Sequence, residues 1–287
     1  MSYLDWLPTE KTCKCPEKAL NCLSKKEWFR NQIPVWWFRP EELSTKFDLS
    51  SRKLHPAIFP TALAVRVIKN YSHLGQTVLD CFSGAGTTLF ASKLTGRNAV
   101  GIELNPEYAK FAENRLTKLK KKDKKESTKQ VQICDDARNI LKYIPQDSID
   151  LIWCSPPYWD MLKQKPSTRN LKNQQYLKNN YSDATHDLSN EPELDGFVDS
   201  MRDIFSKAVV TLRSGSRFVI NTGDFRRKGK LILLHQIYTD LMTDLGLETK
   251  NVIIWDRRKE YDTSLFSYPY NFIVSNGMAE YILEFKK

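Results

Sequence analysis

Short apolar strands and amphipathic helices alternate along most of this 287-residue chain, and this alternation limits the possible folds more than any other feature. Strands joined by helices favour a parallel sheet with right-handed crossovers. We therefore expect an α/β fold with a doubly wound, mostly parallel, seven-stranded sheet. The expected strands are TVLDCFS (77–83), NAVGIEL (98–104), VQICD (131–135), SIDLIWCS (148–155), RFVINTGD (217–224), TKNVIIWD (249–256) and AEYILEFK (279–286).

The chain carries a formal net charge of +10. Clustered Lys and Arg bind phosphates by releasing counterions, so this excess favours a polyanionic partner. No apolar run approaches the roughly 18 residues of a membrane span, and the N-terminus lacks the pattern of a signal peptide. We expect a cytoplasmic, nucleoid-associated protein of prokaryotic or viral origin, with no membrane partner.

Six cysteines in a chain of this kind argue against a disulfide framework. Three of them, Cys13, Cys15 and Cys22, form a loose cluster in CKCPEKALNC and raise the question of zinc. A structural zinc site takes four ligands, usually with paired cysteines, and no fourth Cys or His lies near these three in the sequence. We therefore predict reduced structural thiols and no metal, with a zinc site as the alternative.

The segment VLDCFSGAGTT (78–88) is typical of a strand, a glycine turn and the start of a helix. Gly84 and Gly86 allow a sharp turn and a close approach of the backbone to a ligand. The turn lies at the carboxyl edge of the sheet, where open α/β sheets bind ligands. The third glycine of a dinucleotide-binding motif is missing, and Asp80 would repel a phosphate but attract a cationic amine. A turn used only for packing is the alternative.

Carboxylates also follow the next two predicted strands. Glu103 ends the second strand, a position from which a carboxylate can bind both hydroxyls of a ribose. Asp135 or Asp136 follows the third strand and could accept a hydrogen bond from an adenine amino group. Together with Asp80, these carboxylates fit S-adenosylmethionine better than NAD.

The segment WCSPPYWD (153–160) ends the fourth predicted strand, because two prolines cannot donate hydrogen bonds to a sheet. In a doubly wound sheet this strand lies beside the first one, across the switch point. Ser155 and the turn carbonyls can accept from an exocyclic amine, and Tyr158 offers a face for stacking a planar base. A base inside a duplex reaches such a corner only by flipping out. Asn221 and Asp224 either support this corner or cap a turn.

In these motifs the chain resembles the DNA amino-methyltransferases, which modify cytosine N4 or adenine N6. The resemblance covers roughly residues 54–287 and rests on HPAIFP, DCFSGAGTT, GIELNPEY, DDAR, CSPPY, FVINTGDFRRKGK and NVIIWD. It implies the Rossmann-like fold of the S-adenosylmethionine-dependent methyltransferases. In this family, Ser before Pro-Pro-Tyr occurs mostly in cytosine-N4 enzymes. The resemblance therefore favours cytosine N4, with adenine N6 as the alternative.

The resemblance and the predicted strand ends together give three groups of site residues. Catalysis and base binding are assigned to Ser155, Pro156, Pro157 and Tyr158. Cofactor binding is assigned to His55, Pro56, Thr61, Asp80, Phe82, Ser83, Gly84, Gly86, Thr87, Glu103, Leu104 and Asp136. DNA contacts are expected from Trp159, Arg226, Arg227, Lys228, Arg257 and Arg258.

Many members of this family carry a large target-recognition insertion, and none is obvious in this sequence. We expect residues 1–50 to form a strap packed on the core and residues 51–287 to form the methyltransferase domain. Its cofactor half would span about 55–145 and its catalytic half about 146–287. The candidates for reading DNA are a small target-recognition loop at 159–193, the segment 257–276 and the N-terminal strap.

The sequence thus predicts a site-specific DNA methyltransferase that moves a methyl group from S-adenosylmethionine to N4 of a flipped-out cytosine by direct transfer. The predicted setting is a restriction-modification system, with double-stranded DNA as partner and a cognate restriction endonuclease as a further candidate. The alternatives are an adenine-N6 DNA methyltransferase, an RNA amino-methyltransferase, and an inactive nucleic-acid-binding module.

Overall fold

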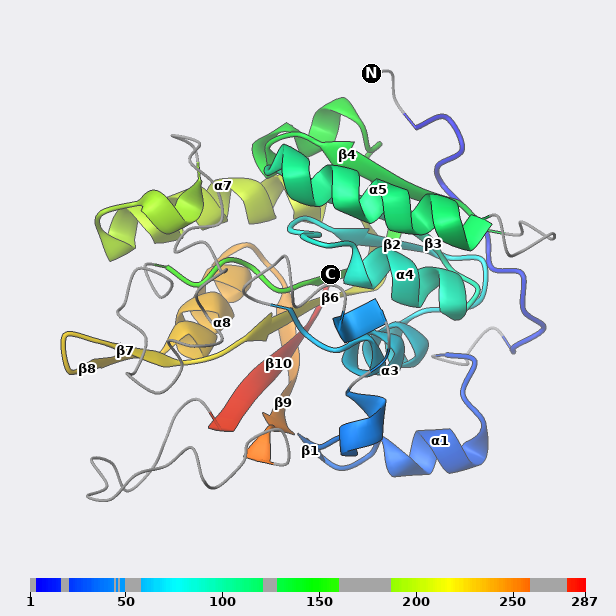
Figure 1. The fold of residues 1–287 in the computed structure, drawn as a ribbon, viewed down its shortest axis with the longest axis horizontal. Helices are drawn as coiled ribbons and strands as arrows, with labels where there is room; N and C mark the ends of the chain where they lie inside the picture. Colours follow the sequence, from blue (N-terminus) through cyan, green and yellow to red (C-terminus); the bar gives the residue numbers. More distant parts are fainter. Residues whose placement is uncertain are drawn as a thin grey trace.

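The computed structural model describes residues 4–16, 21–43, 45, 47–49, 58–120, 128–159, 187–258 and 278–287. Within this part of the chain, eight strands form one sheet in the order β1-β9-β10-β6-β5-β2-β3-β4 (Figure 1). The strands are β1 (Val35–Trp36), β2 (Thr77–Asp80), β3 (Asn98–Glu103), β4 (Gln130–Cys134), β5 (Ile149–Cys154), β6 (Leu212–Thr222), β9 (Glu248–Asp256) and β10 (Ala279–Lys286). The predicted α/β class and mostly parallel sheet are confirmed, and the strand count is corrected from seven to eight.

The additional strand, β1, comes from the N-terminal region that the sequence predicts as a strap on the core. Strand β1 lies parallel to β9 at the edge of the sheet, with Val35 opposite Ile254 and Trp36 opposite Trp255. Trp36 is almost fully buried, and the guanidinium of Arg66 lies 4.2 Å from the centre of its ring. The sequence did not indicate this strand because two residues are too few to show a periodic pattern.

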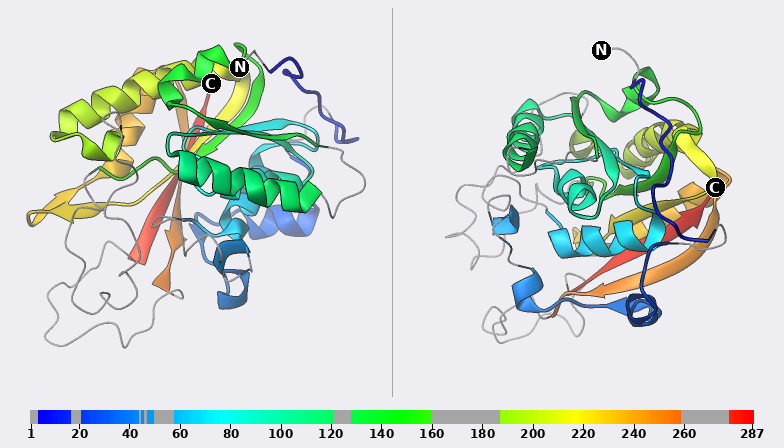
Figure 2. Two further views of the ribbon diagram at one scale, coloured as in Figure 1. Left: turned by 45° about the horizontal axis from the view of Figure 1, so that its top comes forward. Right: turned by 90° about the vertical axis from the view of Figure 1, so that its right-hand side faces the viewer.

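Helices cover both faces of the sheet (Figure 2). On one face lie α3 (Thr61–Tyr71), α4 (Thr87–Leu94) and α5 (Pro106–Lys120), and on the other lie η2 (Ala137–Lys142), α7 (Leu194–Thr211) and α8 (Leu234–Asp244). Of the helices described, none is long and apolar enough to cross a bilayer.

Side chains of the central strands alternate between the two faces, as the pleat of a sheet requires. In β2, Val78 packs against α3 whereas Leu79 belongs to the cluster under α7 and α8. In β5, Trp153 likewise faces α3 whereas Cys154 faces the opposite layer, fully buried. Cys154 therefore belongs to the core.

Two boundaries near the end of α7 differ from the sequence-based expectation. Helix α7 ends at Thr211, and the long strand β6 begins at once with Leu212. After β6 the chain forms a small antiparallel hairpin of β7 (Phe225–Arg227) and β8 (Lys230–Ile232), which extends away from the sheet (Figure 1). Gly229 in its turn has φ +81°, a conformation that glycine adopts without strain.

Strand β2 is the switch point of the sheet. It pairs in parallel with β3 on one side and with β5 on the other, with Val78 opposite Leu151 and Leu79 opposite Ile152. The carboxyl ends of β2, β3 and β5 therefore meet at one edge. Open α/β sheets bind ligands in the crevice outside such an edge.

Candidate active site

A pocket of about 920 Å³ lies at this carboxyl edge and opens to solvent. The loop after β2 lines it together with the corner after β5, so Gly84 and Tyr158 share one cavity, as the sequence predicted. From the predicted site residues it contains Phe82, Ser83, Gly84, Thr87, Glu103, Leu104, Asp136, Ser155, Pro156, Pro157 and Tyr158.

The two glycines of the turn have different roles: Gly84 lines the pocket, and Gly86 allows close helix packing. Gly84, with φ +49°, lines the pocket, and its N–H donates to Glu103 Oε2 at 2.8 Å. Gly86, with φ +81°, precedes α4, and a Cβ there would lie 2.8 Å from Cβ of Ala112. Gly86 therefore serves close packing of α4 against α5, and it is absent from the pocket lining.

Asp80 differs from its predicted place. Its carboxylate accepts hydrogen bonds from Phe82 N at 3.0 Å and from the hydroxyl of Thr88 in the first turn of α4. The side chain is buried beneath the turn and does not line the pocket, and burial raises its pKa to about 6. Asp80 thus holds the glycine turn in shape instead of facing a ligand amine.

Glu103 is the last residue of β3, and its side chain lines the pocket. Its Oε2 accepts from Gly84 N and its Oε1 accepts from Asn105 N at 2.7 Å. Burial raises the pKa of Glu103 to about 7, and the negative charges of Asp80 and Asp187 add to this rise. Each carboxylate oxygen keeps lone pairs, so Glu103 can still accept hydrogen bonds from a diol.

The structure distinguishes the two acids after β4. Asp136 lines the pocket, caps the helix η2 through Arg138 N at 2.8 Å, and forms an ion pair with the guanidinium of Arg138. Asp135 instead accepts from Asn139 and from the hydroxyl of Tyr143, outside the pocket. Of the two residues that the sequence left open, Asp136 is therefore the one placed for ligand contact.

Ser155 stands at the corner beside Asn221 of β6. Asn221 Nδ2 lies 3.4 Å from Ser155 Oγ and donates to Glu280 Oε2 at 2.7 Å, and Glu280 also pairs with Arg257. A carboxylate only accepts hydrogen bonds, so Glu280 determines which end of the amide faces Ser155. Asn221 Oδ1 is buried and has no hydrogen-bond partner in the part of the chain that the structure describes.

Asn221 therefore supports the corner, which was one of its two predicted roles. Asp224 has the other role: it accepts from the backbone N–H of His235 near the start of α8, and it also contacts the ring nitrogen Nδ1 at 2.8 Å.

Tyr158 packs beside Gly223 at the other side of the corner. A Cβ on Gly223 would lie 3.5 Å from the Tyr158 hydroxyl and 3.3 Å from Cγ of Glu280. A larger residue at position 223 would thus crowd both the ring and the carboxylate. Tyr158 is largely buried, yet it contributes to the pocket lining.

The residues expected to contact DNA differ in exposure: Trp159 is buried, whereas Arg226 and Lys228 are exposed. Trp159 is buried, donates from Nε1 to the carbonyl of Glu191 at 2.9 Å, and lies under the guanidinium of Arg227 at 3.9 Å. Its expected DNA contact is corrected to a packing role. Arg226 and Lys228 are exposed on the β7–β8 hairpin.

The two arginines after β9 are also held by acids. Arg257 pairs with Glu280, and Arg258, which is 77% exposed, pairs with Asp256 at 2.7 Å. Exposed ion pairs of this kind contribute little to stability, so Arg258 can exchange its partner for a phosphate at small cost. Arg257 instead belongs to the hydrogen-bonded chain that ends at Ser155.

Several predicted residues lie away from the pocket or outside the described structure. Thr61 donates through its backbone N–H to Asp48 at 2.9 Å and does not line the pocket. His55, Pro56 and residues 160–186 of the predicted target-recognition loop lie outside the described residues.

Sequence reasoning missed part of the pocket wall. The additional lining residues are Ile58, Cys81, Ala85, Asn105, Ala137, Arg138, Asp187, Leu188 and Ile204. Asn105 and Arg138 adjoin recognised motifs and could have been included on that ground. Asp187 and Ile204 gave no signal, because only the fold brings them to the cavity.

Comparisons with known proteins agree with this geometry. In fold, the chain is similar to a geranyl diphosphate methyltransferase solved in complex with S-adenosylmethionine, with a TM-score of 0.50, 16% identity, and coverage of 79% of this chain and 85% of that one. The predicted Rossmann-like α/β fold is thus shared with this solved structure.

The sequence comparisons match part of the chain. Residues 7–114 match the N6/N4 methyltransferase family, described as DNA methylase. The chain is 33% identical over 127 residues to the type II methyltransferase M.BglI of Bacillus subtilis, a match that covers 44% of this chain and 33% of that protein. It is 39% identical over 87 residues to M.ScaI of Streptomyces caespitosus, covering 30% of this chain and 29% of that protein. The matches thus span about a third of these relatives, and the matched part of this chain is similar to DNA methyltransferases.

Proposed function

We propose that this protein is a type II DNA methyltransferase of a restriction-modification system, which uses S-adenosylmethionine to methylate an exocyclic amine of a flipped-out base. One observation carries the proposal: the glycine turn after β2 and the Ser-Pro-Pro-Tyr corner after β5 line the same pocket. The match to DNA methylases and the similarity to type II methyltransferases of bacteria support it.

The pocket residues suit the proposed cofactor. Glu103 offers carboxylate oxygens to ribose hydroxyls, and Asp136 lies further along the same wall as an acceptor for an adenine amino group. Gly84 lets the backbone approach the ligand without a side chain in between. Phe82 and Leu104 provide apolar surface between these polar groups.

S-adenosylmethionine supplies an electrophilic methyl group on a sulfonium, and the chain's own residues prepare the attacking amine. An aromatic amine is a weak nucleophile because its lone pair is delocalised into the ring. Ser155 Oγ accepts a hydrogen bond from Asn221 on one lone pair and keeps a second for an amine N–H. Accepting from the amine favours a pyramidal nitrogen whose lone pair points at the methyl group.

Tyr158 stacks on the flipped base, and the two prolines fix the turn that carries these acceptors. No covalent intermediate is needed: Cys81 lines the pocket, but burial raises the pKa of this thiol well above its usual range, which disfavours a thiolate nucleophile. Cytosine N4 is the proposed target, because Ser155 precedes Pro-Pro-Tyr as in most cytosine-N4 enzymes. Adenine N6 is the second candidate.

We further infer that the N-terminal residues 1–50 act as a strap on a methyltransferase domain formed by residues 51–287. The pairing of β1 with β9 supports this division, since it ties the strap to the sheet. The proposed partners are double-stranded DNA and a cognate restriction endonuclease. Arg226 and Lys228, exposed on the hairpin, are the proposed phosphate contacts among the described residues.

The experiment uses the full chain with methyl-labelled S-adenosylmethionine and either duplex DNA or RNA, followed by digestion to nucleosides. We expect labelled N4-methyldeoxycytidine from DNA. Labelled N6-methyldeoxyadenosine would move the proposal to the second candidate. Label only in RNA, or none in either substrate, would overturn the DNA methyltransferase proposal.

A further inference from the structure

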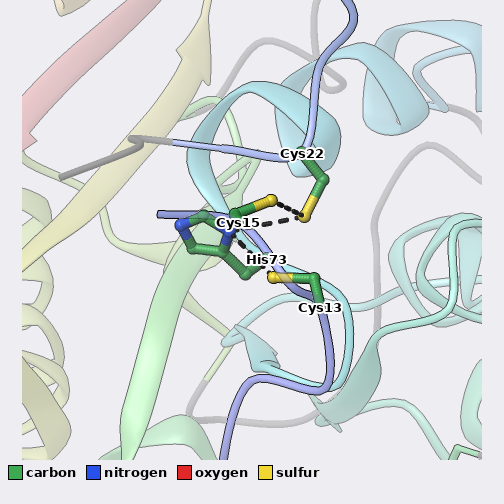
Figure 3. A group of neighbouring side chains, drawn as sticks. All are labelled: Cys13, Cys15, Cys22 and His73. Atoms are coloured by element: carbon green, nitrogen blue, oxygen red, sulfur yellow. Dashed lines mark hydrogen bonds between the residues drawn. The ribbon is translucent and has the colours of Figure 1, made fainter. Parts of the chain in front are cut away.

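Three cysteines and one histidine meet at the amino end of β2. This is the edge of the sheet opposite to the pocket, which lies at the carboxyl end. Cys13, Cys15 and Cys22 come from the N-terminal region, and His73 comes from the turn between α3 and β2 (Figure 3). Their ligand atoms all lie within 4.8 Å of one another. The sequence argued against a metal because no fourth ligand lies near the three cysteines in the chain. The fold corrects this expectation, because it brings His73 to them.

The distances match those of a tetrahedral zinc site. His73 Nδ1 lies 3.3 Å from the Cys22 sulfur and 3.4 Å from the Cys13 sulfur, and the Cys15 and Cys22 sulfurs lie 3.5 Å apart. In a tetrahedron with zinc–sulfur bonds of about 2.3 Å and zinc–nitrogen bonds of about 2.0 Å, sulfur–sulfur edges are about 3.8 Å and sulfur–nitrogen edges about 3.5 Å. Small shifts of the four groups would therefore admit the ion.

The surroundings hold these groups in place. Thr12 donates from its backbone N–H to the carbonyl of Leu74 at 2.8 Å, and Asn21 donates from Nδ2 to the carbonyl of Asn70 at 3.1 Å. His73 is itself buried, and its backbone N–H donates to Gln76 at 2.6 Å. The ligand set is thus held to the last turn of α3 and to the α3–β2 turn.

A buried arginine supplies the charge that such a site needs. Zinc with three thiolates carries a net negative charge, and Arg97 is 2% exposed next to the cluster, donating to the carbonyl of Ser72 at 2.7 Å. Burial lowers the pKa of Arg97, whereas the charges of Cys22, Cys13 and Cys15 raise it. Partners outside the ligand shell, such as Arg97, commonly tune metal sites.

We propose that Cys13, Cys15, Cys22 and His73 bind one structural zinc ion that fastens the N-terminal strap to the amino end of β2. The three thiols release their protons to solvent, and neutral His73 binds through Nδ1. Four protein ligands close the coordination shell, which is the arrangement of structural and not of catalytic zinc. This site is independent of the proposed methyl transfer.

The first test is metal analysis of the full chain, purified without added metal and under reducing conditions. We expect one zinc per chain, bound tightly enough to survive dialysis. The zinc-free chain, prepared with a chelator, should bind Co²⁺ with the ligand-field and thiolate charge-transfer bands of a tetrahedral site. A folded chain that holds no zinc and shows no such bands would overturn the proposal.

Variants separate the cluster from other thiols. Cys22→Ser and His73→Ala should lose stoichiometric zinc and the cobalt bands, whereas Cys134→Ser, a control at an exposed cysteine, should keep both. If the two variants fail to fold, the cobalt titration of the unaltered chain still decides. A disulfide between Cys15 and Cys22, found by mass spectrometry of the freshly purified chain without reductant, would contradict the zinc assignment.

Discussion

The two ends of strand β2 carry two sites that are built in different ways. At the carboxyl end, the glycine turn and the Ser155–Tyr158 corner each come from one contiguous motif, and the parallel pairing of β2 with β5 brings them together. At the amino end, His73 meets three cysteines that lie more than fifty residues earlier in the chain.

We therefore assign the reaction to the carboxyl end of β2 and the attachment of the N-terminal strap to its amino end. The carboxyl end leaves a pocket open to solvent, with acceptors facing a ligand, so changes there should alter the reaction. At the amino end, four side chains that can bind a metal lie close together. Substitutions there should therefore alter how stably the N-terminal strap is attached to the sheet. The predictions below test that separation, beginning with the largest effect.

Replacing Ser155 by alanine removes the proposed acceptor for the target amine. We expect turnover to fall by about 100-fold or more, the magnitude found when one positioned hydrogen-bonding group is removed from an active site. Cofactor affinity, zinc content and melting temperature should stay close to those of the unaltered protein. Steady-state kinetics with calorimetric cofactor binding would measure this.

A matched control lies at the other end of the same strand. Ser148 precedes β5 and donates to the carbonyl of Pro145 at 2.7 Å, away from the pocket. Ser148→Ala should lower stability slightly and leave turnover unchanged. If Ser155→Ala lost cofactor binding as well, the assigned role of Ser155 would be wrong.

Gly86→Ala tests whether a residue at the carboxyl end of β2 acts on stability and not on ligand binding. The left-handed conformation costs about 1–2 kcal/mol for a residue with a Cβ, and the contact of 2.8 Å with Ala112 adds overpacking of about 1–3 kcal/mol. We expect a loss of about 2–5 kcal/mol in the free energy of unfolding, measured by urea denaturation.

Gly229→Ala is the control for backbone strain alone. Gly229 has the same φ of +81°, but a Cβ there would meet no atom within 4 Å among the described residues. Its loss should be about 1–2 kcal/mol. Equal losses at both positions would show that the packing of α4 against α5 does not constrain the turn.

Glu103 gives the carboxyl end a pH dependence. Its raised pKa of about 7 means that the carboxylate is ionised above that pH and protonated below it. Because ribose hydroxyls donate to the ionised form, cofactor affinity should be full at pH 8 and lower by about 10-fold at pH 6. Calorimetric titrations across this range would check the trend.

Glu103→Gln should bind the cofactor weakly at every pH in this range and show no such slope. A slope that persists in the variant would assign the titration to another group in the pocket.

Asn221→Ala should give the smallest effect, because Asn221 positions Ser155 without being assigned a contact with the substrate. We expect turnover to fall by about 10-fold with little change in KM, as for small losses of alignment. Asn251→Ala is the control: Asn251 donates to Glu284 at 2.6 Å, an equivalent pair on the same sheet away from Ser155. Similar turnover in the two variants would remove Asn221 from the positioning role.

The sequence predicted what depends on local pattern. The strand containing Ala279–Lys286 was predicted with its observed bounds, and the turn at Gly84 and the corner at Ser155 were placed at the correct strand ends. These features follow from apolar periodicity, glycine and proline, which act within a few residues of their own position.

What the sequence could not give depends on side-chain direction and on distant segments. Asp80 occupies the predicted strand end but turns towards Thr88, because the Thr88 hydroxyl in the first turn of α4 donates a hydrogen bond to its carboxylate. Trp159 follows the corner but turns inwards to Glu191. His73 joins the cysteines only because α3 returns the chain to the start of β2.

The most direct test of the central claim is a crystal structure of the full chain with S-adenosylhomocysteine, the product form of the proposed cofactor. The account predicts the ligand between the Gly84 turn and the Ser155–Tyr158 corner, with its ribose on Glu103 and its sulfur facing Tyr158. A ligand bound at any other edge of the sheet, or one that leaves Ser155 and Tyr158 out of the same cavity, would contradict it.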